Sequence, residues 1–301
     1  MAEQRHLHWG AEALWQQLEP LLPGLSVEVV ARADSTNSRL LERARIHSGR
    51  RDGPITRPAE LDSHDAPGTP HGRRAGDVQP CLLVAEHQTR GRGRLGRDWQ
   101  SSPGASLTFS LSMPMMPADW SGLSLAVGVA LAEALDPARA GQPPRIGLKW
   151  PNDLWLIDSD GPGRKLGGIL IETVAVGSQR MCVVGVGLNV LPQDTTELSS
   201  GYACLQEVDA GASAPAALAS AMRPLIGALQ RFEQQGFAAF GAAFARRDVL
   251  RGRAITTTQP ELPDGVAEGV DERGALRVLT DRGEHLLVSG EVSVRLQAPP
   301  C

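Results

Sequence analysis

Four apolar segments between residues 145 and 190 follow one another with only short polar turns between them. They span residues 145–150, 154–158, 166–176 and 181–190, and the first two turns are a Pro-Asn-Asp sequence and a glycine-rich stretch at 160–163. Connections this short leave no room for the crossover that joins parallel strands. The segments are therefore predicted to form strands that pair as an antiparallel meander.

Further strand and helix patterns lie on both sides of this meander. Apolar residues at helical spacing predict helices over residues 11–22, 123–135, 214–235 (with a kink at Pro224) and 237–247. Strands are expected over 25–31, 81–85 and 106–113, and capping residues at 34–37 predict another helix start. Short strands with tight turns over 251–296 predict a five-stranded barrel or sheet.

The overall composition suits a folded protein with one poorly apolar segment. The chain has 301 residues, of which 42% are hydrophobic, so it can form one large domain or a large and a small one. Residues 47–80 contain almost no apolar side chains and are rich in Pro, Gly, Arg and Asp. This segment is expected to be a long mobile surface loop.

The charge balance and the cysteines exclude several classes of protein. The net charge is −4, whereas general nucleic-acid and membrane-surface binders usually carry a basic excess. The cysteines are widely spaced and are expected to be reduced thiols, without a zinc site or disulfides: Cys81, Cys182, Cys204 and Cys301. Because the N-terminus lacks a signal peptide and no apolar run could span a bilayer, a cytoplasmic protein is expected.

An arginine- and glycine-rich stretch, EHQTRGRGRLGRDWQSS, occupies residues 86–102 directly after a predicted strand. It alternates Arg90, Arg92, Arg94 and Arg97 with Gly91, Gly93 and Gly96. Glycine lets a backbone turn sharply and approach a ligand, and guanidinium groups bind phosphate or carboxylate oxygens through paired hydrogen bonds. The stretch therefore predicts an anion-binding loop. The alternative is an RNA-binding RG segment, although such segments are usually repetitive and disordered.

Lysine, asparagine and tyrosine are scarce in this chain. The only lysines are Lys149 and Lys165, the only tyrosine is Tyr202, and asparagine occurs at three positions. A compact ammonium differs from the planar guanidinium that dominates elsewhere in the chain. Positions that keep lysine or asparagine are therefore candidates for chemistry that arginine or aspartate cannot perform.

Three short segments contain most of these scarce residues. They are KWPND at 149–153, RKLGGILIE at 164–172 and GVGLNV at 185–190. Each has a simple structural alternative: an Asx turn, a surface lysine at the start of a strand, and a core strand without a ligand. A ligand site is nevertheless favoured for KWPND and RKLGGILIE, because the scarce lysines and one of the asparagines fall in them. The glycines of GVGLNV would also permit close approach of a ligand, but this pattern alone is a weak signal.

Five segments, taken in order, resemble the signature set of biotin protein ligases. They are Asp34-Ser35-Thr36-Asn37, the loop from Gln88 to Trp99, KWPNDL, RKLGGILIE and GVGLNV. The resemblance implies an α+β fold in which helices flank a mixed, mostly antiparallel sheet, similar to the catalytic core of class II aminoacyl-tRNA synthetases. A small SH3-like barrel would follow. The implied domains are a catalytic domain over 1–249, with an insertion at 47–80, and the barrel over 250–301.

The same resemblance implies a two-step reaction. Biotin would react with ATP and Mg²⁺ to give biotinyl-5′-AMP, and a lysine of a biotin carboxyl carrier protein would then accept the biotin. The implied biotin-binding residues are Ser35, Thr36, Asn37, Gln88, Arg92, Gly93, Arg94, Lys165 and Gly168. The implied ATP-binding residues are Arg94, Arg97, Trp99, Asn152, Asp153, Asn189 and Tyr202. Lys165, Arg92 and Arg94 would be catalytic, and Asp153 is the candidate protein contact of Mg²⁺.

The expected assembly is a monomer or a weak homodimer that binds no DNA, because the predicted helix at residue 11 leaves no room before it for a DNA-binding domain. One alternative function is that of a lipoate–protein ligase, which shares the fold and the adenylate chemistry. A non-enzymatic alternative is an RNA-binding module that uses the arginines of residues 86–102.

Overall fold

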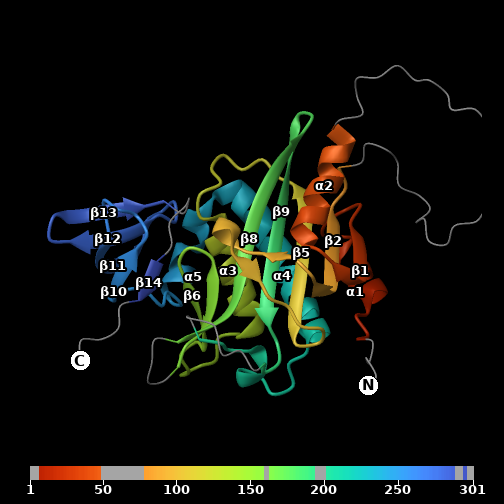
Figure 1. Ribbon diagram of the computed structural model, residues 1–301. Helices are drawn as coiled ribbons and strands as arrows, with labels where there is room; N and C mark the ends of the chain where they lie inside the picture. Colours follow the sequence, from red (N-terminus) through yellow and green to blue (C-terminus); the bar gives the residue numbers. More distant parts are fainter. Residues whose placement is uncertain (1–6, 49–77, 159–162, 194–200, 289–293, 297–301) are drawn as a thin grey trace, which may run out of the picture.

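The computed structural model describes residues 7–48, 78–158, 163–193, 201–288 and 294–296. Its centre is a seven-stranded sheet in the order β1-β2-β5-β9-β8-β7-β6 (Figure 1). The strands are β1 (Ser26–Ala33), β2 (Cys81–Gln88), β5 (Ser106–Pro114), β6 (Ile146–Lys149), β7 (Asp153–Leu156), β8 (Arg164–Val176) and β9 (Gln179–Asn189). In this sheet β1 and β2 run parallel and the other neighbouring pairs are antiparallel, which confirms the predicted meander from β6 to β9.

Helices cover both faces of this sheet. Helix α2 (Thr36–Ser48) lies in front of it in Figure 1, and α3 (Leu123–Leu135) and α4 (Ala214–Gln235) lie behind it. The alternation of strand side chains divides the apolar residues of β9 between the two faces. Val184 joins the main core with α3 and α4, whereas Val183 packs in a smaller cluster against α2. The face that carries α2 is therefore only partly occupied by apolar side chains.

The uncovered part of the α2 face carries small residues. In β9 these are Gly185 and Gly187, which pair with Ser110 and Thr108 of β5. A Cβ atom at residue 185 would overlap the Asn37 side chain, and one at 187 would overlap the ring of Trp99. The alternation of glycines in GVGLNV therefore clears a hollow in the middle of the sheet face, into which other side chains reach.

A second, five-stranded antiparallel sheet follows, in the order β13-β12-β11-β10-β14. Its strands are β10 (Ala254–Thr257), β11 (Asp264–Val270), β12 (Leu276–Thr280), β13 (Gly283–Leu287) and β14 (Val294–Leu296). Hydrogen bonds among the described residues join it to the β6–β7 hairpin of the first sheet: Trp150 Nε1 donates to Gly274 O at 3.0 Å and Lys149 Nζ donates to Val294 O at 2.7 Å. The small sheet therefore lies beside the β6–β7 hairpin, as Figure 1 shows.

Two predicted helices differ from the structure. Helix α1 (Ala11–Leu18) ends four residues before the predicted end at 22, because Pro20 has no N–H to continue the helical hydrogen bonds. In place of a helix over 237–247, a 3₁₀ turn (Phe237–Phe240) precedes the short α5 (Gly241–Ala245). The buried Phe237 and Phe240 are three residues apart, the repeat of a 3₁₀ turn.

Other predictions agree with the structure or are not tested by it. Helices α3 and α4 match the predicted ranges, and α4 continues through Pro224. Cys81, Cys182 and Cys204 are buried and form no disulfide, while Cys301 lies outside the described residues. The loop predicted at 47–80 also lies mostly outside them. The division into domains at residue 250 stays a prediction.

Candidate functional site

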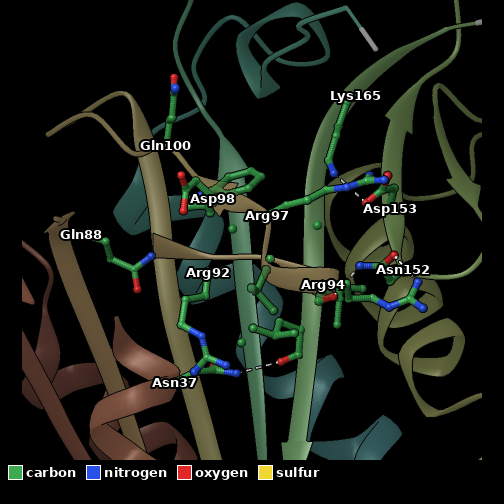
Figure 2. A pocket seen from close by; sticks show the side chains of 18 of the residues that line it. Asn37, Gln88, Arg92, Arg94, Arg97, Asp98, Gln100, Asn152, Asp153 and Lys165 are labelled. Carbon is green, nitrogen blue, oxygen red and sulfur yellow. Dashed lines mark hydrogen bonds and ion pairs between the residues drawn. The ribbon is translucent and has the colours of Figure 1, made fainter. Parts of the chain in front are cut away.

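A cavity of about 340 Å³ lies on the α2 face of the sheet, between the glycine hollow and residues 92–100. Its lining comes from segments that are far apart in the sequence, including α2, β7, β8 and β9 (Figure 2). All the residues predicted for the site line it: Ser35, Thr36, Asn37, Gln88, Arg92, Gly93, Arg94, Arg97, Trp99, Asn152, Asp153, Lys165, Gly168, Asn189 and Tyr202. The fold thus brings the five predicted segments together at one place.

The arginine- and glycine-rich stretch forms a small hairpin over this cavity. Strands β3 (Gly91–Arg92) and β4 (Asp98–Trp99) pair, and a 3₁₀ turn (Arg94–Gly96) joins them. Glycine is required at 91, because a Cβ there would overlap the carbonyl oxygen of Trp99. The N–H of Gly93 donates to Arg97 O at 2.7 Å. The stretch is therefore a hydrogen-bonded hairpin that presents arginines from its turn.

One end of the cavity is neutral and polar. The N–H of Thr36 donates to Gln88 Oε1 at 2.7 Å, and the Thr36 hydroxyl donates to the same oxygen at 3.1 Å. The Ser110 hydroxyl lies 2.6 Å from both Thr36 Oγ1 and Asn37 Oδ1, so its single proton is donated to one of them at a time. These side chains are buried. Such a wall suits a ligand with neutral hydrogen-bonding groups, since it brings no net charge.

The other end of the cavity is cationic. Lys165 Nζ lies 2.8 Å from Asp153 Oδ1, and Arg94 Nη1 donates to Asn152 Oδ1 at 3.2 Å (Figure 2). Burial lowers the pKa of Arg94, and nearby Arg97 lowers it further, while Asp153 raises it. Around the whole cavity, the described residues contribute five cationic side chains and two carboxylates. This excess of positive charge suits an anionic ligand.

Lys149 also lines the cavity, although no role was predicted for it. Its ammonium bonds to Val294 O of β14 and lies 5.2 Å from the centre of the Trp155 ring. Burial lowers its pKa, and Lys165 and Arg97 lower it further against the opposing effect of Asp153. The sequence signals for this residue were the scarcity of lysine and its place in KWPNDL. Asp98 and Gln100 line the cavity as well, and no pattern in the sequence singled them out.

Three predicted residues use their side chains mainly to hold the protein together. Arg92 Nη1 donates to Ser38 Oγ of α2 at 3.0 Å. Asn189 Nδ2 donates to the carbonyl oxygens of Lys165 at 3.3 Å and Ala203 at 3.0 Å. The Tyr202 hydroxyl donates to Leu191 O at 2.7 Å, and burial raises its pKa to about 12. Asn189 and Tyr202 therefore fix the cavity wall, while they remain within reach of a ligand.

Comparison with known proteins identifies the family. The sequence model of the Biotin/lipoate A/B protein ligase family matches residues 78–189, and that of the Biotin protein ligase C terminal domain matches residues 252–295. The Bifunctional ligase/repressor BirA of Escherichia coli (strain K12) is 32% identical over 286 residues, which are 93% of this chain and 77% of that protein. The chain belongs to the biotin protein ligase family.

A second relative and a solved structure agree with this family. The biotin–[acetyl-CoA-carboxylase] ligase of Mycobacterium tuberculosis is 32% identical over 295 residues, which are 96% of this chain and 92% of the relative. The structure of biotin protein ligase from Aquifex aeolicus in complex with biotin and ATP matches with a TM-score of 0.63 at 24% identity, over 91% of this chain and all of that one. The predicted α+β fold of biotin protein ligases is thereby confirmed.

The comparisons also bear on the alternatives. The larger family model covers both biotin and lipoate ligases, whereas these two relatives are named as biotin ligases or as BirA. They therefore support the biotin ligase prediction over lipoate–protein ligase, and an enzyme over an RNA-binding module. Among the described residues, no helix is long and apolar enough to cross a membrane. The roles of individual site residues stay predictions.

Proposed function

We propose that this protein uses ATP to activate biotin as biotinyl-5′-AMP and then transfers the biotin to a lysine of a carrier protein. The observation that carries the proposal is the division of one cavity into a neutral polar end and a cationic end, in a member of the biotin protein ligase family. Biotin combines a neutral cyclic urea with a carboxylate, and ATP supplies the phosphates. The cavity offers a matching environment for each part.

The neutral end would hold the head of biotin. A cyclic urea has two N–H donors and one carbonyl acceptor, and the hydroxyl and amide groups of Ser35, Thr36, Asn37 and Gln88 can satisfy both kinds of group. The urea would thus exchange hydrogen bonds with water for hydrogen bonds with a preformed wall. The valeryl chain would then extend along the glycine hollow, with its carboxylate toward Arg94 and Lys165.

The first step would take place at the cationic end. A carboxylate oxygen of biotin attacks the α-phosphorus of ATP, a new P–O bond forms, and the bond to the β-phosphate breaks to release pyrophosphate. An anion must approach an anion in this step, so preorganised cations are the main requirement. We assign this role to Lys165, Arg94 and Arg97, with Arg92 contributing through its backbone. Trp99, Asn152, Asn189 and Tyr202 would line the nucleotide part of the site.

Magnesium would enter with ATP. Among the described residues there is no group of three or more His, Cys, Asp or Glu side chains placed to hold a metal ion. Mg²⁺ commonly binds through one or two carboxylates together with substrate phosphates and waters. Asp153 at the cationic end fits that limited role, and the ion would help to neutralise the phosphates.

In the second step, the amine of the acceptor lysine attacks the carbonyl carbon of the mixed anhydride, and AMP leaves with the electron pair of the broken C–O bond. Since one relative is named a biotin–[acetyl-CoA-carboxylase] ligase, we propose a biotin carboxyl carrier protein of that enzyme as the acceptor. The hairpin at 91–99 would shield the intermediate from water. We further propose that the protein is cytoplasmic and acts as a monomer or a weak homodimer.

Isotope exchange between ATP and pyrophosphate tests the first step directly. Exchange is expected with biotin and should be negligible without it or with lipoate in its place. Exchange supported by lipoate but not by biotin would identify a lipoate ligase instead. Absence of exchange with either acid, combined with RNA binding that weakens steeply as salt is added, would favour the RNA-binding alternative.

A further inference from the structure

The carboxylate of Glu172 joins two parts of the cavity wall. Glu172 lies on β8, one row beyond the cavity on the face that carries α2. Its Oε1 lies 2.9 Å from Arg92 Nη2 on the hairpin, and its Oε2 accepts from Asn37 Nδ2 on α2 at 3.0 Å. One carboxylate thus uses both oxygens to hold the hairpin and the start of α2 in fixed positions.

Both polar atoms of the Asn37 side chain form hydrogen bonds. Its Nδ2 donates to Leu170 O at 3.1 Å as well as to Glu172, and its Oδ1 lies 2.6 Å from the Ser110 hydroxyl. The absence of a side chain at Gly185 leaves the space that Oδ1 occupies. Asn37 follows Thr36, which bonds to Gln88, so the orientation of Asn37 affects the whole neutral wall. Glu172 therefore acts on residues proposed to bind biotin without lining the cavity itself.

The Arg92 side chain points away from the cationic end. Figure 2 shows it extending toward Asn37, on the side of the cavity away from Lys165 and Asp153. Its Nη1 donates to Ser38 Oγ at 3.0 Å, while Nη2 pairs with Glu172. The Arg92 backbone is part of β3 and pairs with Asp98 of β4. Fixing this guanidinium therefore fixes the hairpin, at the opposite side from the Arg94–Asn152 hydrogen bond.

We propose that Glu172 is a positioning residue that latches the 91–99 hairpin over the biotin end of the cavity through Arg92 and orients the neutral wall through Asn37. The inference rests on the proposed function. Loss of the carboxylate loosens the hairpin and the biotin wall, while the Lys165–Asp153 ion pair at the cationic end, which lies outside the hairpin, is kept. The expected defect is therefore weaker use of biotin and faster escape of biotinyl-5′-AMP, with a smaller rise in the KM for ATP.

The first measurement needs no activity. Hydrogen exchange of the backbone amides at 91–99 is compared between the wild type and Glu172→Gln in the absence of substrates. The neutral amide keeps the size of the side chain but loses the ion pair with Arg92, and this pair is partly exposed, with side-chain exposures of 47% for Arg92 and 24% for Glu172. A modest acceleration of about three- to fivefold is therefore expected. The matched control is Glu284→Gln, which removes a similar exposed pair with Arg277 on the second sheet.

The second measurement is a double-mutant cycle. Glu172→Gln, Arg92→Gln and the double variant are compared in the biotin-dependent exchange assay and in the release of biotinyl-5′-AMP. A latch predicts a rise of about three- to tenfold in the KM for biotin, a smaller rise in the KM for ATP, and a double variant no worse than the more impaired single variant. A merely structural role predicts parallel losses for both substrates together with a lower Tm.

The outcomes separate this inference from the proposed function. Absence of biotin-dependent exchange in the wild type contradicts the function itself, and hydrogen exchange at 91–99 still reports whether the latch exists. If the wild type is active, an unchanged KM for biotin in Glu172→Gln overturns the inference, as do fully additive effects in the cycle or unchanged exchange at 91–99.

Discussion

At the scale of single residues, the two lysines have separate tasks. The Lys149 ammonium is held by Val294 O and the Trp155 ring, at the side where the second sheet joins the first. The Lys165 ammonium pairs with Asp153 and remains partly exposed to the cavity, at 30% of its side-chain surface. Lys165 is therefore the lysine placed to meet the reacting carboxylate and phosphate, and its compact charge can approach both.

Replacement of this charge should impair the first step. Lys165→Ala is expected to slow biotin-dependent pyrophosphate exchange by about 10²- to 10³-fold, the usual effect of removing one preorganised group that stabilises developing charge. Lys165→Arg keeps the charge but not its compact shape, so its exchange rate should lie between those of the wild type and Lys165→Ala. Arg277→Ala on the second sheet is the control for loss of a cation. Near-normal exchange by Lys165→Ala would remove this residue from the catalytic set.

The sequence predicted residues of the site better than it predicted their partners. Scarcity directed attention to Lys165 and Asn152, and both line the cavity. The contact of Lys149 with Val294 spans 145 positions, and no local pattern carries information over that distance. Glu172 was likewise visible only as the last residue of RKLGGILIE, because its partners Arg92 and Asn37 lie on other elements.

At the scale of elements, the hairpin at 91–99 is joined to the neighbouring wall on both sides. Arg94 belongs to its turn and reaches Asn152 in the loop after β6, opposite the Arg92–Glu172 contact. The Arg94 side chain is partly buried, and this burial lowers the pKa of its guanidinium. In the proposed reaction it would contact the bound adenylate directly, so its loss should open the turn and remove a charge-assisted hydrogen bond to the ligand.

Arg94→Ala is therefore expected to release biotinyl-5′-AMP about ten- to a hundredfold faster, as estimated for the loss of a hydrogen bond to a charged group. Single-turnover reactions in which released and bound intermediate are separated give this rate. Arg90→Ala makes the same charge change on the exposed part of the same stretch, outside the cavity lining, and should release the intermediate at the wild-type rate. Equal release rates for both variants and the wild type would contradict a closing role for Arg94.

Elements were predicted well where one local signal dominated. Helices α3 and α4 and the strand cores follow from apolar spacing, since each buries one regular face. The errors lie where a single residue overrides that spacing, as Pro20 does at the end of α1. The hairpin was predicted only as a glycine-rich loop, because its two-residue strands are too short to show a period.

At the scale of the whole molecule, the order in which the strands pair in the large sheet could not be predicted from the sequence. The parallel pairing of β1 with β2 and the placement of β5 beside β9 bring α2, the hairpin and the glycine hollow together. These pairings join segments separated by long stretches of chain, so they depend on how the whole core packs. The resemblance to biotin protein ligases predicted the fold class, which periodicity alone could not provide.

The junction between the two sheets contains a partly buried carboxylate with consequences for stability. Asp248 forms a bridge with Leu148 of β6 through its backbone, and its Oδ1 accepts from the N–H of Leu250 just before β10. Its Oδ2 is buried, with no hydrogen-bond partner among the described residues. Burial raises the pKa of Asp248 from 3.8 to about 6 in the folded protein. The folded state therefore holds this proton more tightly than the unfolded state does.

The free energy of unfolding should consequently fall as the pH rises from 3.8 to about 6. Below pH 3.8 the group is protonated in both states and brings no penalty, whereas above pH 6 the folded state must bury a charge, at a cost of about 3 kcal/mol. Asp248→Asn removes the charge and keeps the acceptor for Leu250. Its free energy of unfolding relative to the wild type should rise by up to this amount between pH 4 and 7.5. Denaturant titrations across that range measure the difference in the free energy of unfolding between Asp248→Asn and the wild type. Asp281→Asn, in an exposed turn, is the control. A difference that does not change with pH would show that Asp248 ionises normally in the folded protein.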